Sequence, residues 1–404
     1  MRELLEESFR AAVAAADPLH IVARHLPPSP KGRIFVAAAG KAAAAMAVAA
    51  ENHFTGELEG IAITRYGHGL PTKRIRVVEA GHPVPDEAGE AAAREILGTV
   101  KGLGEDDLLL ALLSGGGSSL LSLPAPGVSM RQLKDLTGQL LRSGAPIQEM
   151  NTVRKHLSAI HGGRLAAATR ARVLALIISD VTGDDPTHIA SGPCAPDPST
   201  VADAKAILVK YGIGFDAPFS ETPKRGDPVF RKVENKVIAT AHASLEAAAA
   251  VFERNGIAPV ILGDTITGEA AEVAKVMAAL VREIRAYSKP FKPPVALISG
   301  GECTVTIQGQ GGRGGRCSEF LLSLAIELEG VPGAWAIAAD TDGIDGSEDN
   351  AGAVLTPETM KRGQGARERL ARNDSYSFFK EIDALVMTGP TRTNVNDYRA
   401  IVVA

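Results

Sequence analysis

Short, continuous apolar runs alternate along this chain with segments rich in Ala and Leu, and no other feature constrains the fold as strongly. Most of these runs end in Gly, Ser or Asp, and they cover residues 33–40, 61–64, 75–81, 108–116, 173–180, 236–240, 258–264, 295–301, 334–340 and 383–389. Runs without polar interruptions are typical of strands that are buried on both faces. Helical patterns between them, such as residues 244–256 and 268–284, complete repeated βαβ units. The sequence therefore predicts an α/β protein with largely parallel sheets.

The length of the chain and one polar segment predict two domains. A chain of 404 residues exceeds the usual size of a single domain. Residues 212–235 are polar, contain Pro and lack apolar periodicity, which indicates a connection between two α/β domains. We place the N-terminal domain at residues 1–230 and the C-terminal domain at residues 231–404. In each half a strand runs into Ser-Gly-Gly, at 112–119 and at 297–304, which suggests a ligand held in a cleft between the domains.

Charge, cysteine content and hydropathy argue against several classes of protein. The net charge of −4 argues against a nucleic-acid partner held by a basic surface. The three cysteines show no metal-ligand spacing, which indicates reduced thiols and favours the cytoplasm. The first 20 residues lack the apolar segment of a signal peptide, and no run approaches the roughly 18 apolar residues of a membrane helix. We expect a soluble protein without nucleic-acid or membrane partners.

Polar residues follow seven of the apolar runs, at the points where the strands are predicted to end. In open parallel sheets, ligands bind beyond the carboxyl ends of the strands. The residues at these exits are Gly40 with Lys41, Glu79 with His82, the turn from Ser114 to Ser119, Asp180 with Asp184 and Asp185, Gly300 to Glu302, Asp340 to Asp345, and Thr388 to Pro390. Together they predict a site for a charged, oxygen-rich substrate.

Lys41 lies where the first apolar run meets an Ala-rich helix. A cation at this end of a helix opposes the positive end of the dipole, which favours a Lys that grips an anion. A Lys that extends from the turn into solvent is the alternative. The segment is not a Walker A motif, because Phe35 stands where the first Gly would be and Ala42 replaces the Ser or Thr.

The glycine-rich segment GQGGRG, residues 309–314, admits more than one interpretation. It matches the GxGxxG pattern, and the next strand ends in Asp340, near the position of the ribose-binding acid in dinucleotide-binding folds. Against this, Arg313 interrupts the pattern and the glycine density continues to Gly315 and Arg316. A loop with Arg between glycines suits the delivery of a guanidinium group to a phosphoryl group. A solvated loop without a role is the third interpretation.

Carboxylates gather in two clusters, at residues 180–185 and 340–349. Magnesium binds one or two protein carboxylates together with phosphate and water, so either cluster suits this ion. Asp beside Gly is also a common turn former or helix cap, and we expect about half of these acids to have that role.

Between the clusters, Asn151 or Thr152 is expected to cap a helix that carries Arg154, Lys155 and His156 in its first turns. A charge run of this kind is usually a solvated helix face. Three cations early in a helix also suit the binding of a carboxylate or phosphate. Both interpretations stay open at this point.

Several long stretches resemble one family, the class II glycerate kinases, which are glycerate 2-kinases of the MOFRL type. The matching stretches are NTVRKHLSAIHGGRLA (151–166), ISDVTGDDPTHIASGP (178–193), ISGGECTVTIQGQGGRGGR (298–316), DTDGIDGSEDNAGA (340–353) and TGPTRTNVND (388–397). The segments EAGHPVPDEAG and LLSGGGSSLL agree as well. The resemblance covers nearly the whole chain. Proteins of this kind often carry the name hydroxypyruvate reductase.

The resemblance implies an activity and an architecture. The activity is ATP-dependent phosphorylation of D-glycerate, most often at the 2-hydroxyl to give 2-phosphoglycerate and ADP, with Mg²⁺. The architecture is an N-terminal Rossmann-like domain and a C-terminal MOFRL-type domain, with the active site in the cleft between them. A monomer or a homodimer is compatible with the sequence.

Together, the resemblance and the strand exits assign roles to individual residues. Lys41, Arg313 and Asp180 are the expected catalytic residues, the first two by similarity to the family. The residues expected to bind substrate or phosphate are His82, Ser114, Gly115, Gly116, Gly117, Ser118, Ser119, Arg154 and Lys155. The residues expected to bind nucleotide are Gly300, Gly301, Glu302, Gly311, Gly312 and Gly314. The expected metal ligands are Asp180, Asp340, Asp342 and Asp345.

Two other functions remain in view. A reductase that reduces hydroxypyruvate with NAD(P)H would use GQGGRG to bind the pyrophosphate of its cofactor. A sensor that binds sugar phosphates without turnover would also present Ser and Gly at strand ends. The sensor leaves the many acids at the strand exits unexplained.

Overall fold

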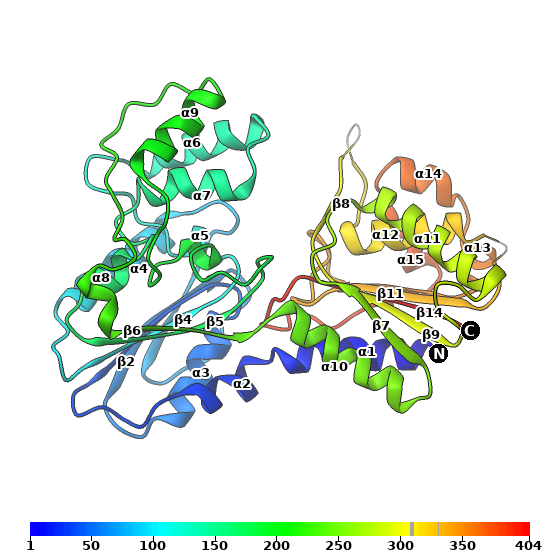
Figure 1. Ribbon diagram of the computed structural model, residues 1–404, viewed down its shortest axis with the longest axis horizontal. Coiled ribbons are helices and arrows are strands. Elements are labelled where there is room, and N and C mark those ends of the chain that lie inside the picture. The colour runs from blue at the N-terminus through cyan, green and yellow to red at the C-terminus, as the bar shows by residue number, and fades with distance from the viewer. Residues whose placement is uncertain (308–310, 330) are drawn as a thin grey trace. The chain divides into compact units, whose positions relative to one another are not determined.

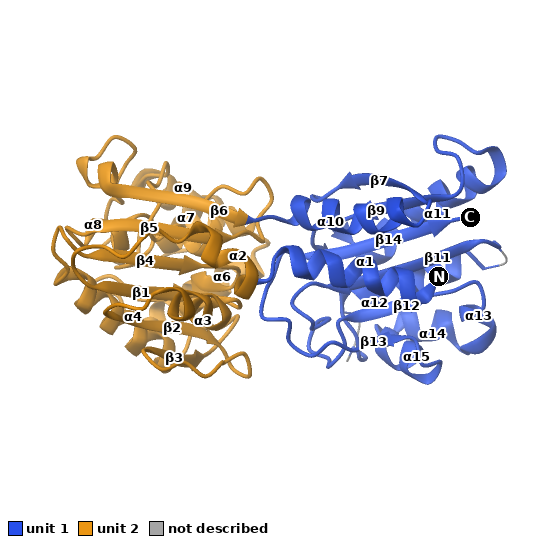
Figure 2. Ribbon diagram, turned by 90° about the horizontal axis from the view of Figure 1, so that it is seen from below, with its two compact units in different colours: residues 1–17, 239–404 blue, residues 18–238 orange. Residues whose placement is uncertain are grey.

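The chain folds into two compact units, which are shown separately coloured in Figure 2. The structure, a computed structural model, describes residues 1–307, 311–329 and 331–404. Unit 1 consists of residues 1–17 and 239–404, and unit 2 consists of residues 18–238.

Unit 2 is built on a six-stranded sheet with the order β3-β2-β1-β4-β5-β6. The strands are β1 Ile34–Ala39, β2 Leu58–Arg65, β3 Ile75–Ala80, β4 Leu108–Leu113, β5 Arg172–Ile178 and β6 Val233–Ala239. The pairs β1–β2, β1–β4, β2–β3 and β4–β5 are all parallel. This is the strand order of the Rossmann fold, and it confirms the predicted parallel sheet in the N-terminal half of the chain.

Helices cover both faces of this sheet (Figure 1). Those of eight or more residues are α3 Ala43–His53, α4 Glu87–Lys101, α6 Met130–Arg142, α7 Ile147–Lys155 and α9 Val201–Lys210, and the short ones are α2 Pro18–Ile21, α5 Gly117–Leu120 and α8 Arg164–Ala167. Every residue of β1 and β4 is buried, as their uninterrupted apolar runs predict. Ala92, Ala93 and Ile96 of α4 pack in one core cluster with Phe35 and Leu109 of these strands.

Unit 1 contains a mixed six-stranded sheet with the order β13-β12-β11-β14-β9-β7. The strands are β7 Ala258–Gly263, β9 Val295–Ser299, β11 Ala334–Asp340, β12 Gly352–Leu355, β13 Leu385–Val386 and β14 Asp397–Val403. Only the described pair β7–β9 is parallel, whereas β11–β12, β11–β14, β12–β13 and β14–β9 are antiparallel. The expectation of a largely parallel sheet is therefore wrong for this half of the chain. The physical reason is two strands absent from the sequence prediction. β14 lies between β11 and β9 and runs opposite to both, and β12 lies between β13 and β11 and runs opposite to both.

The helices of unit 1 lie on both faces of its sheet (Figure 1). They are α1 Arg2–Ala15, α10 Ala241–Arg254, α11 Ala270–Tyr287, α12 Arg316–Glu327, α13 Thr359–Arg362, α14 Ala366–Ala371 and α15 Ser375–Glu381. A small two-stranded sheet pairs β8 Gly268–Glu269 with β10 Cys303–Thr304. Among the described helices, none combines the length and apolar character that crossing a membrane requires.

The first helix belongs to unit 1, which differs from the expected division at residues 230 and 231. Leu5, Phe9 and Ala12 form a helical stripe that is buried with Leu245 and Phe252 of α10. The stripe follows i, i+4, i+7 spacing, so it presents one apolar face. The sequence shows this face but not the surface that covers it.

Candidate active site

The turns after β1 and β4 of unit 2 pack directly against each other. The backbone N–H of Lys41 donates to the carbonyl of Gly115 at 2.8 Å, and that of Ala42 donates to Ser114 Oγ at 3.0 Å. Gly40 has a φ of +130°, and a Cβ atom there would lie 2.1 Å from Ser114 Oγ. Ser114 is fully buried, so its hydroxyl holds the β1 turn instead of facing a substrate, contrary to the sequence assignment.

Lys41 and His82 both lie beside the glycine turn that follows β4. A Cβ atom added to Gly116 would lie 2.9 Å from the ring of His82 and 3.5 Å from Cγ of Lys41. Gly116 has a φ of +81°, which a residue with a side chain rarely adopts. The strand order changes direction between β1 and β4, and in such folds the ligand binds at this point. The structure thus brings together Lys41, His82 and the predicted anion-binding turn.

A strained segment that the sequence analysis missed supports the same turn. Ala190, Ser191 and Gly192 all have positive φ, between +50° and +58°. A Cβ atom on Gly117 would lie 2.5 Å from Cβ of Ala190, and Ser191 Oγ donates to Ser118 Oγ at 2.8 Å. Left-handed Ala and Ser cost free energy and are often found at functional sites. Nothing in these residue types predicts this conformation, because neither residue favours it.

The cations at residues 154–156 end a helix instead of beginning one, which corrects the predicted position. Arg154 and Lys155 lie in the last turn of α7, where positive charge complements the helix dipole. Arg154 Nη2 donates to the carbonyl of Ser118 at 2.9 Å, and burial lowers the pKa of Arg154 to about 10. Lys155 is buried and pairs with buried Asp197 at 2.8 Å, so this Lys is structural and does not line a substrate site.

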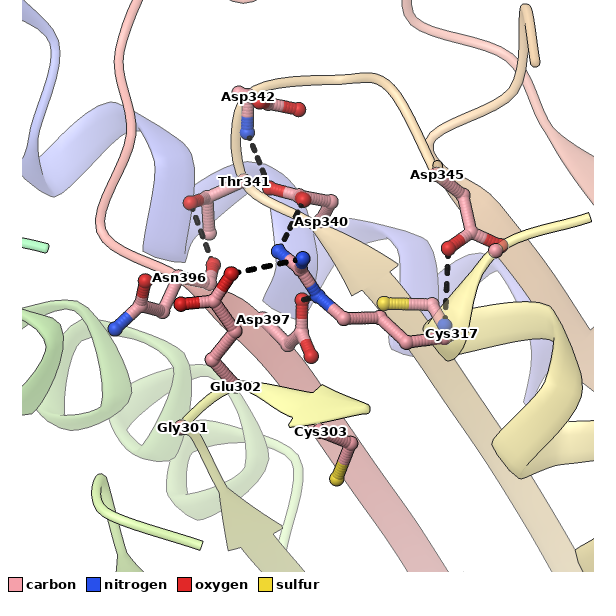
Figure 3. Close-up of polar contacts among 12 residues, drawn as sticks. Gly301, Glu302, Cys303, Cys317, Asp340, Thr341, Asp342, Asp345, Asn396 and Asp397 are labelled. Carbon is pink, nitrogen blue, oxygen red and sulfur yellow. Dashed lines mark hydrogen bonds and ion pairs between the residues drawn. The ribbon is translucent and has the colours of Figure 1, made fainter. Parts of the chain in front are cut away.

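Arg316, at the start of α12, is the centre of an acidic network in unit 1. Its guanidinium group pairs with Asp340 and Asp397, each at 2.7 Å, and with Glu302 at 2.9 Å. Figure 3 shows Asp340, Glu302 and Asp397 converging from separate segments of the chain. Burial lowers the pKa of Arg316, but attraction to the three carboxylates, Asp397 first, outweighs burial and raises it. Neither Arg316 nor Asp397 was predicted from the sequence as a site residue.

A second buried Arg fixes the Ser-Gly-Gly turn that follows β9. Arg399 Nη1 donates to the carbonyl of Gly300 at 3.0 Å, and Nη2 donates to Asp397 Oδ2 at 2.7 Å. Gly301 has a φ of +102°, and a Cβ atom there would lie 2.3 Å from the carbonyl oxygen of Ile266. Gly300 and Gly301 therefore allow close backbone packing beside the network around Arg316, and Glu302 belongs to that network.

Arg313 lies in different surroundings from Arg316. Its side chain is 54% exposed and pairs with Glu348, with Nε 3.0 Å from Oε2. Its guanidinium carbon lies 4.1 Å from the ring centroid of Tyr376. The structure does not join Arg313 to the network of Asp340 and Glu302, whereas Arg316 lies at the centre of that network.

Asp345 caps α12, which argues against its assignment as a metal ligand. Its carboxylate accepts hydrogen bonds from the backbone N–H groups of Cys317 and Ser318, both at 2.9 Å, and from Ser318 Oγ at 2.5 Å. Burial raises the pKa of Asp345 despite these bonds. In Figure 3 Asp345 lies beside Cys317, apart from Asp340 and Asp342.

Replacing Asp345 with Ala is expected to lower the free energy of unfolding by about 2 kcal/mol, because two helix N–H groups lose their acceptor. Chemical denaturation measures this loss. Glu283→Ala, an exposed change on α11, is the control and should cost far less. Equal losses for both variants would contradict the capping role.

The capped helix also bears on the dinucleotide interpretation of residues 309–314. Residues 309 and 310 lie outside the described residues. A dinucleotide fold binds pyrophosphate at the N–H groups of the helix that follows the glycines, and here Asp345 occupies those of Cys317 and Ser318. The preceding strand, β10, pairs with β8 and not with the six-stranded sheet. The described geometry does not support a cofactor-binding βαβ unit here.

The remaining metal candidates have partly engaged oxygens. Asp340 Oδ1 accepts from the N–H of Asp342 at 3.0 Å, and Asp342 Oδ1 accepts from the N–H of Ile344 at 2.9 Å. Asp180 is partly buried just beyond β5. Within the described parts of the chain, no three His, Cys, Asp or Glu side chains are placed to hold a metal by themselves. These acids are better suited to share a metal ion with bound phosphate than to hold a metal ion by protein ligands alone.

Two family models match most of this chain. Residues 4–220 match a domain of unknown function, DUF4147, and residues 295–397 match the MOFRL family. A crystal structure of a glycerate kinase from Thermotoga maritima aligns with a TM-score of 0.91 and 40% identity, covering 100% of this chain and 99% of that one.

Full-length relatives carry two different names. A glycerate 2-kinase of Pyrococcus horikoshii is 41% identical over 434 residues, which cover 100% of this chain and 97% of the relative. A D-glycerate 2-kinase of Thermotoga maritima is 41% identical over 409 residues, with 98% and 97% covered. A protein of Agrobacterium vitis, provisionally named a hydroxypyruvate reductase, is 50% identical over 418 residues, with 100% and 94% covered. From its motifs, its fold and these full-length matches, the chain belongs to the MOFRL-type glycerate kinase family.

Proposed function

We propose that this protein transfers the γ-phosphoryl group of ATP to D-glycerate, at the 2-hydroxyl, to give 2-phosphoglycerate and ADP. The observation that carries the proposal is the meeting of Lys41 and His82 at the glycine turn after β4, in a chain that aligns end to end with glycerate 2-kinases. Phosphoryl transfer depends on alignment and charge neutralisation more than on covalent chemistry. A Lys beside backbone N–H groups supplies both.

Each unit carries residues that suit the binding of phosphate. In unit 2, Lys41 neutralises charge on the transferring group, and the backbone of Gly115 and Gly116 binds an anion. The N–H of Gly117 already donates to the carbonyl of Ser114 at 3.1 Å. In unit 1, Arg316 neutralises charge on the triphosphate. Asp340 and Asp342, both in unit 1, are the proposed carboxylates for Mg²⁺, which would offset the charge of the phosphate oxygens when bound. Asp180, in unit 2, is a separate candidate ligand. The three cysteines are buried thiols, which supports a reducing, cytoplasmic setting.

Incubation of the protein with ATP, Mg²⁺ and D-glycerate, followed by phosphorus NMR, tests this function. We expect a phosphate resonance on carbon 2 and equal amounts of ADP. A phosphate resonance on carbon 3 would show that the 3-hydroxyl is the acceptor. The absence of a phosphorylated product would refute the proposed kinase activity.

The reductase is tested in parallel. Oxidation of NADH or NADPH by hydroxypyruvate is followed at the absorbance of the nicotinamide. We expect no turnover above background, because the N–H groups that would bind the pyrophosphate are occupied by Asp345.

A further inference from the structure

Unit 1 contains a cavity of about 250 Å³ beside the glycine-rich loop. The residues in its lining that matter here are Val305, Ile307, Gly312, Arg316, Glu319 and Asn373. Pockets for whole ligands usually measure about 300–1,000 Å³, so this cavity suits one flat group of a larger molecule. Of these lining residues, the proposed phosphoryl transfer uses only Arg316.

The walls of the cavity suit the faces of an aromatic ring. Val305 is partly buried, and Ile307 is an apolar side chain that is 67% exposed. A Cβ atom on Gly311 would lie 2.8 Å from Cγ2 of Ile307, and one on Gly312 would lie 2.6 Å from Cβ of Asp374. The two glycines therefore pack directly against Ile307 and Asp374, and the aliphatic wall that suits one face of a flat ring comes from Val305 and Ile307.

One buried acid gives the cavity a polar edge. Glu319, on α12, is 5% exposed, and its Oε1 accepts a hydrogen bond from Asn373 Nδ2 at 3.0 Å. The pKa of Glu319 is raised to about 7, chiefly by burial; the hydrogen bond from Asn373 lowers this pKa, and repulsion from Glu269 and Asp345 contributes to the rise. Arg316 is the cation that lines the same cavity. Near neutral pH, the Glu319 carboxyl group is therefore able to donate a hydrogen bond as well as accept one.

We propose that this cavity binds the adenine base of ATP, with Glu319 donating to a ring nitrogen and accepting from the exocyclic amino group. The proposal rests on the proposed function for the identity of the nucleotide. Adenine presents an acceptor beside an amino donor, which matches a neutral carboxyl group. Arg316 lines the cavity and also pairs with Asp340, so a base held here directs the phosphates toward that network.

Direct binding of ADP and GDP to the full-length protein tests the base site. Isothermal titration calorimetry with Mg²⁺ at pH 6 and pH 8.5 compares the wild type with Glu319→Gln and Glu319→Ala. The raised pKa of Glu319 means that the donating form is present below about pH 7 and is lost as the pH rises through that value. ADP binding by the wild type should therefore weaken by about tenfold or more between the two pH values.

Glu319→Gln is the matched control, because its amide donates and accepts at every pH. Its ADP affinity should equal that of the wild type at pH 6 and should change less with pH. The phosphate of ADP titrates equally with either protein, so it does not contribute to this difference. Glu319→Ala should bind ADP about tenfold more weakly at pH 6 and lose the preference over GDP. If both variants bind ADP like the wild type, with the same pH dependence, the base site is wrong.

The two proposals fail in different ways. ADP binding that depends on Glu319, without phosphorylation of glycerate, would leave the base site standing and remove the proposed function. Phosphorylation of glycerate, together with ADP binding that is unaffected by the Glu319 variants, would support the proposed function and remove the base site. Thermal unfolding of Glu319→Gln, expected within a few degrees of the wild type, shows that the comparison is made on folded protein.

Discussion

Replacing Arg316 with Ala is expected to lower kcat for glycerate phosphorylation by about 10²-fold or more, because a preorganised cation at developing phosphate charge is lost. The structure sharpens this expectation, since Arg316 is the shared partner of Asp340, Asp397 and Glu302. Without it, three carboxylates would repel the triphosphate.

Two controls separate catalysis from stability in this experiment. The variant also leaves buried Asp340 without its Arg316 partner, so we expect a loss of unfolding free energy of about 3 kcal/mol. Arg316→Lys keeps the positive charge and should recover part of both losses. Arg313→Ala, on the neighbouring exposed Arg, should keep kcat within a few fold of the wild type. A larger effect from Arg313 than from Arg316, in steady-state assays on folded protein, would return the role to the residue that the sequence alone suggested.

The Lys41→Ala variant should lose about 10²-fold in kcat while the turn that carries residue 41 stays folded. The fold holds the turn of Lys41 through backbone groups, namely its own N–H to Gly115 and that of Ala42 to Ser114 Oγ. These bonds do not involve the Lys41 side chain, so its removal should spare them.

Steady-state kinetics and thermal unfolding check this prediction together. Lys101→Ala, an exposed change at the end of α4, is the control and should leave both kcat and the melting temperature unchanged. A loss of stability with normal turnover would mean that Lys41 only supports the fold.

The site in unit 2 could be predicted in part because parallel strands end at one edge of a sheet. Lys41 and the turn from Ser114 follow adjacent strands, and the prediction that they meet is confirmed. The sequence could not separate a hydroxyl that faces a ligand from one that holds a neighbouring turn, as Ser114 does. Burial also decided against Lys155, whose partner Asp197 lies 42 residues away in the chain.

In unit 1 the glycine-rich segment was recognised, but the choice between its two Arg residues was not decided by sequence. Arg313 and Arg316 both follow glycine pairs, so their local sequences are alike. They differ in their partners, which come from distant segments at Glu348 and at Asp397. In the sequence Asp345 is likewise one of several acids beside Gly, and only the fold shows that it caps the N-terminus of α12.

By itself, the sequence determined what depends on local order: most of the buried strands, the glycines at their ends, the α/β class and the family motifs. Apolar periodicity and turn residues act within about ten positions, so they can be recognised in a single sequence. Tertiary structure alone decided that β14 joins the second sheet antiparallel to its neighbours and that α1 packs on α10. It also decided which charged groups pair, because strand direction and desolvation depend on residues that are distant in the chain, such as Arg316 and Asp397, which are 81 positions apart.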